Sequence, residues 1–249
     1  RRDKRTGQLQ RYGHLSTGNY NARSARLYTD LSHLTCDAAI TEDMDAVFRH
    51  LSSHNRLPTL QQLVMAPFHL HSHMLERIGQ AASAAAKGKD ARIVLKMNAL
   101  TDEVLIAALI DAGALGVQID LIVRGACMLP AQVPGRTENI RVRSVIGRFL
   151  EHTRVFYFAW GTHEEVYLSS ADWMHRNMLR RVELAWPVHH RKLRQRIIDE
   201  CLADYLHDDR NAWQLQSDGR YQPPMRPSAG FGAQNMLMKN YGGAASARQ

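Results

Sequence analysis

Residues 149–177 read FLEHTRVFYFAWGTHEEVYLSSADWMHRN and predict two strands joined by a turn. The first apolar run covers residues 155–158, a glycine follows at Gly161, and a second apolar run covers residues 166–168. Short apolar runs on either side of a glycine turn are typical of a β-hairpin. We therefore expect this segment to place two neighbouring strands in a sheet.

Polar residues stand at the ends of both runs. His152 and Arg154 precede the first run at a spacing of two, so on an extended strand they would project from the same face. Ser169, Ser170 and Asp172 follow the second run, and we expect them to close the same pocket. A fixed cation, hydroxyl donors and an imidazole suit a phosphoryl group, because the imidazole can move a proton or carry the phosphate. A lone His-x-Arg pair is more often a solvated strand edge. Here the serines that follow at hairpin distance favour a phosphate-binding site instead.

The composition limits the number of domains and the kinds of partner. The chain has 249 residues, of which 45% are hydrophobic, enough for one large domain or two small ones. Its net charge of +8 and isoelectric point near 9.7 indicate a polyanionic partner, such as nucleic acid, a nucleotide, polyphosphate or anionic lipid. The three widely spaced cysteines fit neither a disulfide framework nor a metal-binding knuckle, so we expect a reducing cytoplasm. No apolar run approaches the ~18 residues that cross a bilayer.

A strand–helix–strand unit precedes the hairpin. Residues 93–97 predict a strand, Thr101 is the expected N-cap of a helix that ends at Gly113, and residues 117–123 predict a second strand. The long connection implies parallel strands with a right-handed crossover. Ligands gather at the carboxyl ends of such strands, and Arg124 stands at one of them.

The remaining elements follow from the same periodicities. We expect helices over residues 41–51, 74–86 and 189–205, strands over residues 140–145 and 213–221 and from Arg181, and a helical link over residues 145–150. Residues 1–10 indicate a loop or one limb of a hairpin. His69, His71 and His73 alternate and would suit a metal ion if they lay on a strand, but a polar loop entering the helix is the interpretation we favour.

Several long segments carry a family resemblance: EHTRVFYF, VYLSSADWMHRN, YGHLSTGNYNARSARLYTDLSHLT and LIVRGACML. Over roughly residues 8–222 the chain resembles the C-terminal part of bacterial polyphosphate kinase, a member of the phospholipase D-like superfamily. The resemblance implies an α/β fold with a phospholipase D-like mixed sheet flanked by helices, preceded by a partial copy of a second such domain. We place the remnant of the first domain at residues 1–60, the second domain at residues 61–221, and a disordered tail at residues 222–249.

The resemblance also implies a function. The family transfers the terminal phosphate of ATP reversibly to inorganic polyphosphate through a phosphohistidine. His152 matches a catalytic histidine that contacts the nucleotide phosphate, and Arg124 and Arg181 match arginines at the phosphate site. Tyr28 matches a tyrosine that contacts ATP; taken alone, it serves equally well as a packing residue with a solvated hydroxyl.

The family's phosphohistidine lies on a His-x-Lys strand that would precede Arg1, and His14 is not that residue. The arginines associated with Mg²⁺ would also lie upstream, so we expect no metal ligands in this chain. We expect the chain alone to fold at least in part, with residues 1–60 loose or paired onto the second unit, and to make no polyphosphate. For the complete enzyme we expect ATP, ADP and polyphosphate as partners, Mg²⁺, a homo-oligomer and a cytoplasmic location. The basic charge is compatible with peripheral membrane association.

Two other functions are kept as alternatives. A phospholipase D-like phosphodiesterase or nuclease would carry His-x-Lys followed by four residues and an aspartate, but here Arg154 takes the lysine position and Ala159 the aspartate position. A non-catalytic basic domain that binds nucleic acid would fit the charge, but no nucleic-acid motif is present, and we expect no specific nucleic-acid partner.

Overall fold

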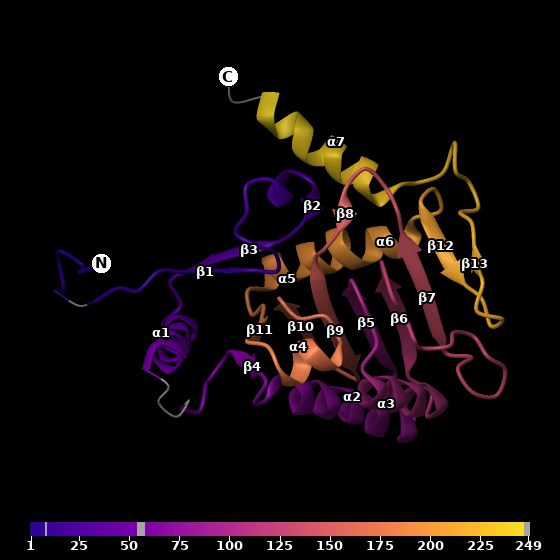
Figure 1. Cartoon of the computed structure of the whole chain (residues 1–249), viewed down its shortest axis with the longest axis horizontal. Coiled ribbons are helices and arrows are strands. Elements are labelled where there is room, and N and C mark those ends of the chain that lie inside the picture. Colours follow the sequence, from indigo (N-terminus) through magenta and orange to yellow (C-terminus); the bar gives the residue numbers. More distant parts are fainter. Residues whose placement is uncertain (8, 54–57, 247–249) are drawn as a thin grey trace.

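The computed structural model describes residues 1–7, 9–53 and 58–246, and most of them surround one nine-stranded sheet (Figure 1). The strand order is β13-β12-β7-β6-β5-β9-β10-β11-β4. The bounds are β4 Val64–Ala66, β5 Ala91–Met97, β6 Gln118–Val123, β7 Ile140–Val145, β9 Arg154–Trp160, β10 His163–Ser169, β11 Glu183–Pro187, β12 Ala212–Leu215 and β13 Tyr221–Gln222. β5, β6 and β7 are parallel, and every other pairing in this sheet is antiparallel. The expected hairpin is β9–β10, and the expected parallel pair is β5–β6.

Helices cover both faces of the sheet. α2 (Leu70–Ala86) and α3 (Glu103–Ala114) pack on one face. The other face is covered by α5 (Arg191–Ile197), a π-helical segment (Ile198–Ala203) and α6 (Asp204–His207). Successive residues of a strand point to opposite faces, so Ile93 and Leu95 enter the first core whereas Val94 enters the second. The α/β fold with a mixed sheet between helices is confirmed.

The N-terminal segment lies beside this sheet and pairs with the loop between two of its strands. β1 (Gly13–Ser16) and β3 (Ser32–Thr35) form a two-stranded antiparallel sheet, followed by α1 (Ala38–Ser53). Between β1 and β3 in the sequence, a 3-10 turn (Ser24–Arg26) leads into β2 (Tyr28–Thr29). β2 pairs in parallel with β8 (Leu150–Glu151), which belongs to the loop between β7 and β9. Residues far apart in sequence are thereby brought to one place.

Two local predictions were wrong. Asp102, not Thr101, caps α3: the helix begins at Glu103, after an extended Asp102 whose side chain accepts the Leu105 N–H at 3.0 Å. The expected helical link over residues 145–150 is instead a bend followed by β8. Its Leu150 N–H donates to Leu27 O, so the N-terminal segment draws this loop into an extended form.

The bounds of several other elements also differ from the predictions. β11 begins at Glu183 rather than at Arg181, whose N–H donates to Arg176 O at the end of α4 (His175–Leu179). The expected terminal strand is a hairpin of β12 and β13. α2 begins at Leu70, so His71 and His73 are helical. The chain after residue 221, predicted to be disordered, contains α7 (Ala233–Ser246). No helix in the described ranges is long and apolar enough to cross a membrane.

Candidate functional site

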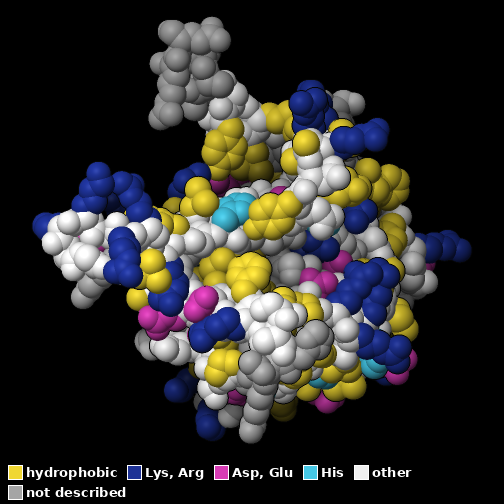
Figure 2. All heavy atoms as spheres, turned by 60° about the vertical axis from the view of Figure 1, so that its left-hand side comes forward, with side chains coloured by type: hydrophobic (Ala, Val, Ile, Leu, Met, Phe, Trp, Pro, Cys, Tyr) yellow, Lys and Arg dark blue, Asp and Glu magenta, His cyan; other side chains and the backbone are white. Residues whose placement is uncertain are grey.

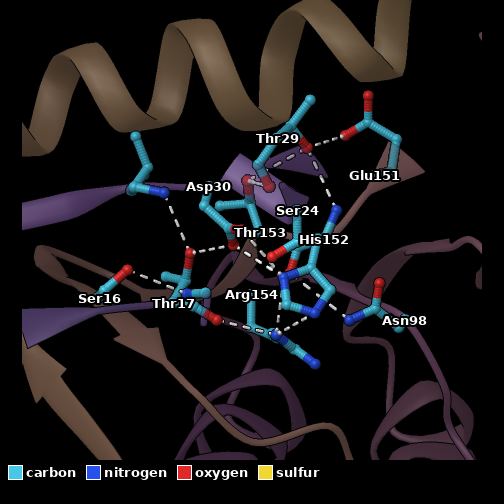
Figure 3. Close-up of polar contacts among 12 residues, drawn as sticks. Ser16, Thr17, Ser24, Thr29, Asp30, Asn98, Glu151, His152, Thr153 and Arg154 are labelled. Carbon is cyan, nitrogen blue, oxygen red and sulfur yellow. Dashed lines mark hydrogen bonds and ion pairs between the residues drawn. The ribbon is translucent and has the colours of Figure 1, made fainter. Parts of the chain in front are cut away.

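The carboxyl ends of β5, β6 and β10 and the starts of β9 and β11 meet at one edge of the sheet. Asn98 follows β5 and Arg124 follows β6, while His152 lies between β8 and β9. β8 brings β2 to the same edge. The site therefore combines the strand ends of the main sheet with Thr29 and Asp30 of the N-terminal segment (Figure 3). Tyr28 of the same segment lies against His152.

His152 lies between a carboxylate, a guanidinium and an aromatic ring. Its Nδ1 is 2.9 Å from Asp30 Oδ1 and 3.1 Å from Asp30 Oδ2. Arg154 Nη1 lies 3.3 Å from Nδ1 and 3.2 Å from Nε2 of the same ring. The Tyr28 ring is tilted against the imidazole with 4.9 Å between centroids. The imidazole thus has a fixed orientation, set largely by the N-terminal segment.

Arg154 is bound by the protein itself. Its Nε and Nη2 donate to the two oxygens of Asp172 at 3.2 and 3.0 Å, and its Nη1 donates to Thr17 O at 2.8 Å. Arg154 and Asp172 are both 8% exposed, and Asp172 also accepts the Asn98 N–H at 2.7 Å. Because its donors are committed to these partners, we assign Arg154 to holding the site together rather than to binding a ligand.

The serines after β10 do not close the pocket around His152, contrary to the prediction. Ser169 Oγ donates to Leu184 O at 2.9 Å, and Ser170 Oγ donates to Glu183 Oε2. Both hydroxyls join β10 to β11, because the antiparallel pairing turns them toward the neighbouring strand. Only Asp172 of the predicted trio reaches the His152 cluster.

Arg124 is the cation with free donors next to His152. Its Nε donates to Glu151 O at 2.7 Å and to Asn98 Oδ1 at 3.1 Å. Within the described part of the chain, its two terminal nitrogens have no hydrogen-bond partner. The side chain lines a cleft of about 500 Å³ together with Tyr28 and Arg148. Arg124 can therefore offer two N–H groups to an anion in this cleft.

Arg181 lies at the same sheet edge but not in the same cluster. It is exposed and precedes β11, and the strand order places β11 four positions from β6, the strand that Arg124 follows. Four strand spacings correspond to roughly 19 Å. The structure therefore places Tyr28 against His152 and Arg124 against the carbonyl of Glu151, the residue before His152, and leaves Arg181 apart. A phosphate role for Arg181 stays a prediction.

A buried acid beneath the site was not singled out from the sequence. Glu151 is 4% exposed and pairs with Lys96, which is 2% exposed, at 2.7 Å from Nζ to Oε2. Burial by itself would raise the pKa of Glu151, but the Lys96 charge and the hydrogen bonds from its other partners hold that pKa below its usual value. Burial and the Glu151 carboxylate raise the pKa of Tyr205. Glu151 is thus held as an anion and Tyr205 as a neutral donor.

Asp30 was also missed. It sits in the quoted stretch LYTDLSHLT, where nothing in the spacing points to a histidine 122 positions later. Its Oδ1 additionally accepts the Thr17 hydroxyl at 2.8 Å. Pairing of β2 with β8 is what brings Asp30 to the imidazole, and that pairing has no local sequence signal.

The three alternating histidines do not form a metal site. His71 Nε2 is 3.1 Å from Asp102 Oδ1, His73 Nε2 is 3.0 Å from the Tyr167 hydroxyl, and His69 is exposed. Across residues 1–7, 9–53 and 58–246, no group of three or more His, Cys, Asp or Glu side chains is gathered to hold a metal ion. The described residues therefore do not fit a magnesium site, and no chemical step is assigned to one here.

Comparison with known proteins decides the family. The family model for polyphosphate kinase C-terminal domain 2 matches residues 63–234, and the model for C-terminal domain 1 matches residues 1–57. The chain belongs to the polyphosphate kinase family. It is therefore related to transferases of the kinase type.

Individual relatives agree with this assignment. The chain is 53% identical over 214 residues to the polyphosphate kinase of Burkholderia cenocepacia, covering 86% of this chain and 31% of the relative. It is 50% identical over 233 residues to that of Paraburkholderia phytofirmans, covering 94% of this chain and 34% of the relative. The crystal structure of polyphosphate kinase from Porphyromonas gingivalis matches with a TM-score of 0.88 and 34% identity, over 96% of this chain and 37% of that one. The chain thus spans about a third of the length of these polyphosphate kinases.

Proposed function

We propose that this chain forms the nucleotide- and polyphosphate-handling part of a polyphosphate kinase. The single observation that carries the proposal is the placement of Arg124 beside His152 at the end of the parallel strands, in a chain of this family. A half-buried cation with free donors and an oriented imidazole are what a phosphoryl group needs. ATP, ADP and inorganic polyphosphate are the substrates we assign.

The proposed reaction has two balanced steps. In the first step a histidine of the complete enzyme attacks the terminal phosphorus of ATP, so that an N–P bond forms, the P–O bond to ADP breaks and phosphohistidine results. In the second step a terminal oxygen of polyphosphate attacks that phosphorus, so that a new P–O bond forms and the N–P bond breaks to free the histidine. Arg124 would neutralise charge on the transferring oxygens. Arg181, four strand spacings along the same sheet edge, would bind another phosphate group. Tyr28 would contact the nucleotide.

His152 would contact the nucleotide phosphate through Nε2. In this arrangement the Nδ1–H group donates a hydrogen bond to Asp30, which fixes the tautomer and leaves Nε2 to exchange a proton with a phosphate oxygen or to accept a phosphate. Mg²⁺ would accompany ATP in the complete enzyme, which we further propose to be a cytoplasmic homo-oligomer.

The test uses a chimeric enzyme in which this chain takes the place of the segment that it matches in the Burkholderia cenocepacia protein. With ATP and polyphosphate, the chimeric enzyme should release ADP and lengthen the polymer. We expect the 249-residue chain alone to make none. An unchanged polymer with the chimeric enzyme would contradict the proposal.

The phosphodiesterase alternative is disfavoured by one contact. In a His-x-Lys site the lysine faces the phosphate, whereas Arg154 is bound to Asp172 and Thr17. Hydrolysis of bis-p-nitrophenyl phosphate by the chimeric enzyme would favour this alternative.

A nucleic-acid-binding domain predicts one continuous basic surface. Figure 2 shows the Lys and Arg side chains of one face in separate groups with hydrophobic side chains between them. Steeply salt-dependent DNA binding, together with no preference for ATP or polyphosphate, would favour this alternative.

A further inference from the structure

The loop from Ile146 to His152 carries much of the site. It presents the Glu151 carbonyl, which orients Arg124 at 2.7 Å, and it ends on His152. The His152 N–H donates to Thr29 Oγ1 at 3.2 Å. Any movement of this loop would therefore displace the cation and the imidazole together.

Gln234, in the first turn of α7, forms two hydrogen bonds with the backbone of this loop. Its side-chain amide donates to Phe149 O at 2.9 Å, and its Oε1 accepts the Phe149 N–H at 2.9 Å. Gln234 is 2% exposed. Both backbone groups of one loop residue are thus satisfied by a single side chain from a helix 85 positions later.

The same amide reaches the buried acid. Gln234 Nε2 donates to Glu151 Oε1, which also accepts the Tyr205 hydroxyl at 2.9 Å. The other oxygen, Oε2, takes Lys96 at 2.7 Å and the Thr29 hydroxyl at 3.0 Å. All four donors converge on one carboxylate, so Glu151 is fixed from the sheet, α6, α7 and the N-terminal segment at once.

Gly147 leaves room for the contact. A Cβ added at Gly147 would lie 2.4 Å from Gln234 Oε1 and 2.8 Å from its Cδ. Only a residue without a side chain lets the amide lie flat against the loop. A methyl group at this position would displace the flexible end of Gln234 and leave the backbone of α7 in place.

Other residues of α7 attach it to the helices on this face of the sheet: Leu237 packs against the second core, and the Tyr241 hydroxyl donates to Glu200 and accepts from Arg196 Nη2. Asp208 Oδ2 accepts the Ala233 N–H at 2.8 Å and anchors the start of the helix. Figure 1 shows α7 leaving the sheet from this point, with its far end directed outward. The helix is therefore held at its first turn and again at Tyr241, and Gln234 in the first turn is the residue that bonds the loop before β9.

We propose that α7 is a latch for the site: Gln234 is a positioning residue that holds the Phe149–His152 loop so that Arg124 and His152 face the same phosphate. This inference rests on the proposed function for its consequence in catalysis, but its structural half can be measured separately. Gln234 itself touches no substrate in this account.

The test compares Gln234→Ala, Gly147→Ala and the control Asn235→Ala in the chimeric enzyme, since Asn235 is the exposed neighbour on the same helix. Hydrogen exchange of residues 147–152 should become about tenfold faster in the first two variants, because a protecting hydrogen bond is lost. Exchange in the other strands should stay unchanged. The kcat for polyphosphate synthesis should fall roughly tenfold, and KM for ATP should change less. Asn235→Ala should match the unmodified enzyme in both measurements.

Unchanged exchange over residues 147–152, or faster exchange across the whole sheet, would overturn the latch. So would a normal kcat in Gln234→Ala. If the unmodified chimeric enzyme makes no polyphosphate, the proposed function fails, and local loosening in the two variants would still support the latch because exchange does not depend on catalysis.

Discussion

Asp30 Oδ1 and His152 Nδ1 lie 2.9 Å apart, although the two residues are 122 positions apart in the sequence. The contact joins the N-terminal segment to the strand-end site and gives the imidazole a defined orientation. If His152 acts in phosphoryl transfer, the carboxylate should matter as much for its geometry as for its charge.

Asp30→Asn should therefore lower the kcat of the chimeric enzyme by about 10- to 100-fold, since an amide can present the wrong group to Nδ1. Steady-state kinetics with ATP and polyphosphate would measure the effect. Asp111→Asn, an exposed change on α3, is the matched control. Equal kcat values in Asp30→Asn and Asp111→Asn would show that Asp30 does not contribute to the reaction.

Arg124 should be needed for the nucleotide. Removing its two free donors in Arg124→Ala should lower kcat/KM for ATP about 10- to 100-fold, and Arg124→Lys should not restore it, because lysine cannot bond Glu151 O and a phosphate with a planar fork. Arg136→Ala, on an exposed loop, serves as control. Full recovery with lysine would show that only a point charge is required.

The Lys96–Glu151 pair should be strongly coupled. Glu151→Gln or Lys96→Met alone leaves one buried charge unpaired and should cost about 3–5 kcal/mol of unfolding free energy. The double variant should cost much less than the sum of the two, because neither charge remains. Urea unfolding of the unmodified protein, the two single variants and the double variant gives this double-mutant cycle. Additive losses would mean that the two charges do not stabilise each other.

His73 should make stability depend on pH. Burial, and secondarily the Arg77 charge, lower the pKa of His73, whose Nε2 lies 3.0 Å from the Tyr167 hydroxyl. A depressed histidine pKa favours the neutral form, so its contribution is full above the unfolded value of 6.5 and is lost as the pH falls through the folded value.

His73→Gln should accordingly flatten the fall in unfolding free energy between about pH 7.5 and about pH 5. His175→Gln, on the exposed part of α4, should leave the fall unchanged. Urea unfolding at both pH values makes the comparison. An identical pH dependence in His73→Gln and the unmodified protein would count against this role.

Elements with strong local signals were predictable. The β5–β6 parallel pair and the β9–β10 hairpin follow from apolar runs and turn residues, and their ends place Arg124 and His152 at one edge. What the sequence could not supply depends on distant contacts. From the sequence, Arg154 could have bound a phosphate, but in the structure its guanidinium is paired with Asp172. The loop after β7 was predicted to be helical because its partner strand, β2, lies more than a hundred residues earlier. α7 was hidden in a segment rich in Gly, Ala and Ser, since its contact with the site is made by one buried polar side chain, that of Gln234.

The most direct test of the account is ATP-dependent polyphosphate synthesis by the chimeric enzyme carrying His152→Ala, with the exposed His175→Ala as its control. We predict that His152→Ala loses about 10²- to 10⁴-fold in kcat while His175→Ala keeps the normal rate. Near-normal turnover in His152→Ala would contradict a catalytic part for the imidazole and, with it, the central claim that this sheet edge handles the phosphoryl group.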